Sequence, residues 1–192
     1  DNFELRVTPL CPDQTGLVAA NVTSATADTS WDDMSANGAT GYEYAVTTSA
    51  TPPASGDATE DTFFEATGLA PSTVHYLHVR TSCGGGDFGL WSTTSFKTLC
   101  VSVTDFVEGF ETTTGAVFPD CWASAGTTLG NAYPQSSTGI SGARNLYMYT
   151  GGMVTLPTVS NAGDETHRMV MKVRANFTAG ETIQFGYLTN PA

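Results

Sequence analysis

Basic residues are scarce in this 192-residue chain, which has seven lysines and arginines against 19 aspartates and glutamates and a formal net charge of −12. A chain of this charge repels nucleic acid phosphates and anionic lipid surfaces, so neither is an expected partner. Charged residues of both signs make up only 14% of the chain, whereas hydrophobic residues make up 40%. That hydrophobic content is enough for a packed core, so the chain is not expected to be disordered.

Sustained helical periodicity and long apolar runs are also missing, and no run approaches the length that spans a membrane. No signal peptide is recognisable, so we expect a mature chain or an excised piece. Thr, Val, Tyr and Phe recur between Gly and Pro, a composition that favours short strands and turns. The sequence therefore predicts an all-β protein without membrane insertion.

Catalytic motifs are absent as well: there is no G-x-S-x-G elbow, no H-E-x-x-H motif and no phosphate loop. His167 stands near Asp164, Glu165 and Ser160, but without a nucleophile motif a solvated turn is the better interpretation. We therefore expect a protein that is not an enzyme.

The cysteines lack the spacing of a zinc site, because none lies in a C-x-x-C pair and no histidine stands beside them at ligand spacing. Four are present, and an even number in an acidic, lysine-poor β protein indicates two disulfides and an oxidising compartment. The residues alone leave all three pairings open. They are Cys11, Cys83, Cys100 and Cys121.

Strand candidates do recur at regular intervals in the first half of the chain. Turn residues separate them, and two loops, 50–58 and 84–89, are rich in Pro or Gly. This cadence is typical of a β-sandwich of about 100 residues. The candidates are residues 16–22, 24–32, 40–49, 61–71, 72–83 and 90–100.

Residues 11–100 resemble a fibronectin type III domain. The matching features are Trp31 at the end of the second strand, "GYEYAV" in the third, "TGLAPST" before the sixth and "FKTLC" in the seventh. The "CP…L" start and the "VR…CGGG…WS…F.TLC" finish are similar to type III domains of secreted Bacteroidota proteins. In that family the loop after the sixth strand lies near the N-terminus, so the resemblance implies a Cys11–Cys83 disulfide and leaves Cys100–Cys121.

One position departs from the family pattern, because His75 stands where a tyrosine is expected. His75 shares the parity of Leu77 and Val79, so it should face the core and can hydrogen-bond a nearby backbone group. His78 and its neighbours of the other parity should face outward. The two histidines then lie on opposite faces, so we expect no His–His metal site and interpret both as structural or solvated.

Residues 101–192 resemble the N-terminal part of a jelly-roll module of the cleaved-adhesin or MAM-like kind. The matching features are "F-x-E-G-F-E", "FPDCW", "G-x-x-x-L-x-M" and "GYLTNP". Strand candidates are residues 143–150, 152–159, 167–176 and 181–189. Residues 1–10 resemble the last strand of a preceding jelly roll, so we expect a window cut from a longer array.

The jelly-roll resemblance implies a structural calcium ion held by Glu111 and, second, Glu108, with a late aspartate that would be Asp1 of the preceding module. Calcium needs six to eight oxygen ligands, so two glutamates do not make a site by themselves. Ordinary surface glutamates are the equal alternative.

A glycan site would need aromatic faces beside polar groups. Tyr147 and Tyr149 share a strand parity, and Tyr133 is a further candidate; packing in a core is the alternative interpretation for such residues.

Three functions follow as hypotheses. The first is a fragment of a secreted bacterial cell-surface adhesin or filament, exported by type IX secretion, with a spacer type III domain and a jelly roll that binds an extracellular glycan or protein. The second is an accessory region of a large secreted peptidase or glycoside hydrolase. The third is a self-assembling subunit in which residues 1–8 complete a neighbouring copy by strand addition.

Overall fold

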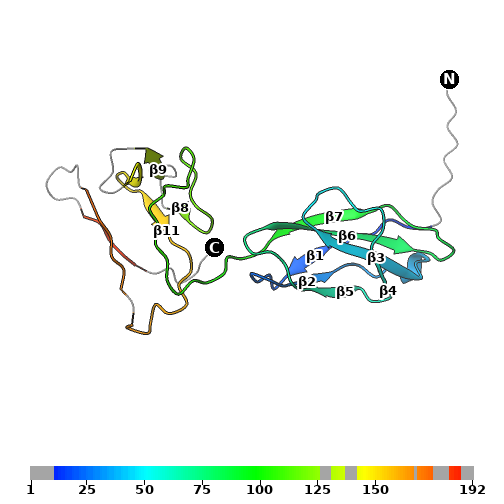
Figure 1. Cartoon of the computed structure of the whole chain (residues 1–192). Coiled ribbons are helices and arrows are strands. Elements are labelled where there is room, and N and C mark those ends of the chain that lie inside the picture. The colour runs from blue at the N-terminus through cyan, green and yellow to red at the C-terminus, as the bar shows by residue number, and fades with distance from the viewer. Residues whose placement is uncertain (1–10, 126–130, 137–141, 167, 175–181, 187–192) are drawn as a thin grey trace, which may run out of the picture. The chain divides into compact units, whose positions relative to one another are not determined.

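The computed structural model describes residues 11–125, 131–136, 142–166, 168–174 and 182–186 (Figure 1). Its contacts divide the chain into two compact units. The first unit runs to Asp105 and also includes Asp120–Trp122 and Leu156–Ser160. The second unit contains Phe106–Pro119, Ala123–Thr155 and the residues from Asn161 onward. The strand predicted at residues 1–10 lies outside the described residues.

The first unit is a sandwich of two antiparallel sheets, which Figure 1 shows as two layers. One sheet has the order β1-β2-β5 and the other has the order β4-β3-β6-β7. A short 3-10 helix, Ser35–Asn37, precedes β3. The all-β fold class is therefore confirmed. The strands are β1 Val18–Ala20, β2 Ala27–Ser30, β3 Gly41–Thr47, β4 Asp57–Thr59, β5 Phe63–Ala66, β6 Val74–Ser82 and β7 Ser92–Lys97.

The core of the sandwich forms where alternate residues of facing strands meet. Tyr42 on β3 and Leu77 and Val79 on β6 are buried, and Trp31 follows β2 to join them. The Trp31 and Tyr42 rings make an edge contact with centroids 5.9 Å apart. Tyr44, two residues along β3, lies 4.4 Å from the Phe64 ring of the opposite sheet. Because β3 alternates strictly, its two tyrosines reach the same core.

His75 faces the core as predicted and is buried. Its Nε2 lies 3.1 Å from the carbonyl oxygen of Ala70, and its ring stacks on Phe96 with centroids 5.7 Å apart. The imidazole therefore makes the backbone hydrogen bond that its position favours.

Strand β4 was not predicted, because Asp57 and Ala58 fall in the segment interpreted as the loop 50–58. The strand has three residues and pairs with β3 at the edge of the sheet, with Ala58 opposite Glu43. Three residues are too few to show a period of two, and the two prolines before β4 hide it further.

Two disulfides form in the first unit, Cys11–Cys83 and Cys100–Cys121, with Cα separations of 5.6 and 5.9 Å. These are the two pairings that the family resemblance implies. The second bond ties the end of the sandwich to Cys121. Nearby, the Val103 amide donates to Thr158 O over 2.9 Å, so two distant segments hold the residues that follow the sandwich.

The described part of the second unit contains two antiparallel pairs of strands. Strand β8 (Ala123–Ala125) pairs with β11 (Met153–Thr155), and β9 (Ala132–Ser136) pairs with β10 (Arg144–Met148). Strands β10 and β11 lie within two of the predicted segments, 143–150 and 152–159.

The other two predicted strands do not form over the residues that are described there. Residues 168–174 and 182–186 have no strand structure. Met169 and Val170, on opposite parities, are 59% and 77% exposed, so neither side of the segment packs on a core. An alternating pattern predicts a strand only where one face finds a packing partner. Among the described residues, no helix is long and apolar enough to cross a membrane.

Candidate functional site

His78 lies on the outer face of the four-stranded sheet, as its parity predicts, but it is not solvated. Its residue exposure is 0%, because residues after β3 and Trp91 cover it. Its Nδ1 lies 2.8 Å from Thr93 Oγ1, and its Nε2 lies 3.0 Å from Thr47 Oγ1 and 3.1 Å from Ser49 O. Both ring nitrogens are therefore used within the fold, and the imidazole has a structural role.

Burial lowers the pKa of His78 below its ordinary value of 6.5, and the hydrogen bond to Ser49 O opposes that effect only in part. In the unfolded chain His78 takes up its proton near 6.5. Between 6.5 and the lowered folded pKa, the unfolded state therefore binds more protons, and the free energy of unfolding falls as the pH falls. Below the folded pKa this contribution levels off.

We expect His78→Gln to flatten this dependence when urea unfolding is followed from pH 7.5 to pH 5. The quantity compared is the slope of the free energy of unfolding against pH, so a loss of stability that is the same at every pH does not obscure the result. Equal slopes for the two proteins would show that His78 does not titrate differently in the folded state.

Arg80 occupies the same outer face and is enclosed by aromatic rings. Its guanidinium carbon lies 4.2 Å from the centroid of Phe88 and 4.5 Å from that of Trp91. Its Nη2 also lies 2.5 Å from Glu43 Oε2. The cation is thus paired with a carboxylate and two rings, an arrangement that fixes the loop after β6 and leaves little of the charge for a ligand.

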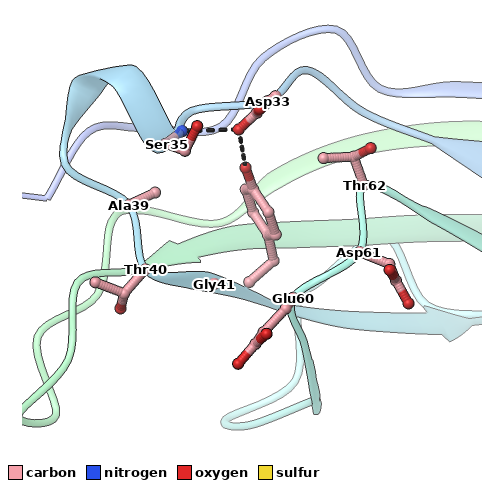
Figure 2. Close-up of a pocket in the computed structure, with 9 residues that line it drawn as sticks. Asp33, Ser35, Ala39, Thr40, Gly41, Glu60, Asp61 and Thr62 are labelled. Atoms are coloured by element: carbon pink, nitrogen blue, oxygen red, sulfur yellow. Dashed lines mark hydrogen bonds between the residues drawn. The ribbon is translucent and has the colours of Figure 1, made fainter.

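A hollow of about 350 Å³ lies at one end of the sandwich (Figure 2). Asp33 forms part of its wall, where its Oδ1 accepts the Ser35 amide over 2.8 Å and the Tyr42 hydroxyl over 3.1 Å. The hydrogen bond from the Ser35 amide is the largest cause of a lowered Asp33 pKa, while burial raises the pKa of Tyr42. The Asp33 carboxylate therefore stays ionised and anchors the start of the 3-10 helix.

The other acidic residues of this hollow do not converge with Asp33. Figure 2 shows the carboxylates of Glu60 and Asp61 pointing away from it. Within the described residues, no group of three or more His, Cys, Asp or Glu side chains is placed to hold a metal ion. The hollow therefore offers acidic walls without the geometry of a cation site.

The two glutamates predicted to bind calcium have other contacts in the structure. Glu111 reaches across to accept the backbone amides of Ala143 and Arg144, at 3.2 and 3.1 Å. Glu108 accepts the nearby amide of Phe110. Both carboxylates accept backbone amides, and no third acidic group joins them in the described chain, so calcium at these residues stays a prediction. Asp1 lies outside the described residues.

The three tyrosines predicted to bind a ligand lie close together on β9 and β10. Tyr147 is directly opposite Tyr133 in the strand pairing, and their ring centroids are 5.6 Å apart. Tyr149 follows the end of β10, where its amide donates to Asn131 O over 2.7 Å. Tyr147 and Tyr149 are 38% and 62% exposed. Adjacent exposed aromatic rings can stack on the apolar face of a ligand, so this is the candidate binding site.

The strand pairing adds polar residues that the sequence interpretation missed. Asn145 lies opposite Gln135, and both have the parity of the tyrosines on their own strand. From alternation within each strand, the sequence could have shown that Gln135 lies on the same side as Tyr133 and that Asn145 lies on the same side as Tyr147. Only the pairing of β9 with β10 shows that the two rows meet.

Solved structures similar to this chain include fibronectin type III domains. No protein family model matches the chain. No curated protein matches it. Among solved structures, the fibronectin type III domain of the human collagen alpha-1(XX) chain is 19% identical, covers 50% of this chain and 92% of that one, and has a TM-score of 0.40. A type III domain from the human KIAA0970 protein is 18% identical, covers 55% and 88%, and also has a TM-score of 0.40. Both of these solved structures are fibronectin type III domains.

Proposed function

We propose that this chain is a non-catalytic segment of a secreted, multidomain bacterial surface protein. In this proposal the sandwich of the first unit acts as a spacer, and the second unit binds an extracellular glycan or protein. The observation that carries the proposal is the group formed by half-buried Tyr133 on β9 and exposed Tyr147 and Tyr149 on and directly after β10. Large exposed rings on a strand pair are typical of recognition surfaces.

The disulfides support secretion as part of the proposal. Cys11–Cys83 and Cys100–Cys121 would persist in an oxidising environment outside the cell. A bacterial source and export by type IX secretion rest on the sequence resemblance alone. An accessory region of a secreted hydrolase would also contain disulfides and a binding surface, so these residues do not distinguish it from an adhesin. Catalytic motifs in flanking sequence would distinguish the two.

The test of the binding role is retention of the 192-residue chain on a panel of immobilised polysaccharides and extracellular matrix proteins. We expect retention on at least one probe, and about tenfold weaker binding by Tyr147→Ala because one stacking surface is lost, which corresponds to about 1.4 kcal/mol. The matched control is Phe63→Ala, which removes a ring that is 61% exposed on the first unit. Equal weakening by both variants, or no retention on any probe, would contradict the proposal.

Self-association is a second candidate function, favoured by the exposed apolar residues of the segment 168–174. Met169, Val170 and Val173 are all more than half exposed, and an apolar segment of this kind can add a strand to a neighbouring copy. Light scattering across a range of concentrations tests the idea. A dimer that Val170→Lys dissociates would support it, and a concentration-independent monomer would exclude it.

A further inference from the structure

The pairing of β9 with β10 creates one surface on which aromatic and amide side chains alternate. Tyr133 lies opposite Tyr147, and Gln135 lies opposite Asn145. The hydrogen bond from the Tyr149 amide to Asn131 O extends the same pairing by one step. We call this surface the tyrosine–amide face. Its residues are Asn131, Tyr133, Gln135, Asn145, Tyr147 and Tyr149.

The opposite side of β9 packs inward. Ala132 and Pro134, which alternate with the residues of the tyrosine–amide face on β9, are almost completely buried. On β10 the residues of that opposite parity are Arg144, Leu146 and Met148, of which Met148 is 40% exposed. The Arg144 guanidinium donates to Thr113 Oγ1 and Ser136 Oγ, both at 2.9 Å. On β9 the tyrosine–amide face is therefore the outer face, and the guanidinium of the nearby Arg144 is bound to other residues.

The chemistry of the six side chains is specific. Tyrosine rings present an apolar face and a hydroxyl, and a primary amide has two donors and an acceptor. Asn131 Nδ2 already donates to Thr150 O over 2.6 Å, and Asn145 Nδ2 donates to Leu146 O over 3.4 Å, so each of these amides has only part of that capacity left for a ligand. None of the six carries a charge at neutral pH, on a chain whose net charge is −12. Such a face matches a ligand that has apolar C–H surfaces, many hydroxyl groups and no charge.

We propose that the tyrosine–amide face binds a neutral polysaccharide, with sugar rings stacked on Tyr147 and Tyr133 and hydroxyl groups hydrogen-bonded by Gln135 and Asn145. This inference rests on the proposed binding function and narrows its ligand class. An acidic polysaccharide is disfavoured because the rest of the chain repels it and the face supplies no cation to offset that repulsion.

The test is affinity electrophoresis of the full chain in gels containing galactomannan, β-1,3-glucan or α-mannan, with alginate as the acidic probe. We expect at least one neutral polymer to retard the chain and alginate to leave it unretarded. The double variant Gln135→Glu with Asn145→Asp keeps the shape of both side chains but removes their amide donors. It should weaken binding to the neutral polymer about tenfold or more, since two hydrogen bonds of about 1 kcal/mol each are lost.

Circular dichroism of the double variant shows whether the strands persist, and Phe63→Ala serves as the control that should bind normally. Retardation by alginate alone, or unchanged binding by the correctly folded double variant, would overturn the neutral-polysaccharide inference.

Binding to a matrix protein that Tyr147→Ala abolishes, with no neutral polymer bound, would also overturn it while leaving the proposed binding function intact. No retention on any glycan or protein would contradict both the neutral-polysaccharide inference and the proposed binding function.

Discussion

Replacing Cys11 and Cys83 together by alanine is expected to lower the free energy of unfolding of the first unit by about 4 kcal/mol. The bond joins residues 72 apart in sequence, so its removal frees a long loop in the unfolded chain. Cys11 is also buried, with its sulfur 3.3 Å from Thr81 Oγ1, so native packing is lost as well. Urea unfolding followed by tryptophan fluorescence measures the change.

The matched control is the double variant of Cys100 and Cys121, whose bond spans only 21 residues. We expect a loss of about 3 kcal/mol there, because the entropy of loop closure grows slowly with loop length. A first unit whose stability is unchanged without Cys11–Cys83 would show that the bond does not constrain the sandwich.

Leu77→Ala is expected to destabilise the first unit by about 3 kcal/mol. Leu77 is fully buried on the central strand β6, in one cluster with Trp31, Tyr42 and Val79. Removing three side-chain carbons leaves a cavity that these large neighbours on two sheets can fill only in part. The midpoint of urea unfolding should fall accordingly.

Leu90→Ala is the control, since it makes the same chemical change at a residue that is 69% exposed. Its effect should stay within about 0.5 kcal/mol, as is usual for surface positions. Similar losses for the two variants would contradict the assignment of Leu77 to the core.

The sandwich was largely predictable because its strands are long enough to show alternation on a buried face. The segment "GYEYAV" was predicted as the third strand, and its Tyr42 and Tyr44, two residues apart, both reach the core in the structure. The parity of His75 with Leu77 likewise predicted a core imidazole bonded to backbone, which it is. In such strands the buried residues are those of one parity, so the period of the sequence predicts which side chains are buried.

Features that depend on contacts between distant segments were not predictable. His78 has outward parity, yet Ser49 and Trp91 cover it from elsewhere in the chain. The alternation in 168–174 resembles a strand, but no partner strand pairs with it among the described residues. Alternation reports which side of a strand a residue occupies and does not report what lies against that side.

The candidate site was predictable in part. Shared parity grouped Tyr147 with Tyr149, but their proximity to Tyr133 follows from the pairing of β9 with β10. The same register brings Gln135 to Asn145, and a shift of one residue would send these side chains to the other face. A single sequence does not specify that register.

The most direct test of the account is amide hydrogen exchange of the full chain with and without its retained ligand. The account predicts added protection in residues 131–136 and 144–149, and none in the first unit. Protection centred instead on the acidic hollow around Asp33 and Glu60 would contradict it, because the sandwich would then be the binding element and the tyrosine–amide face would not.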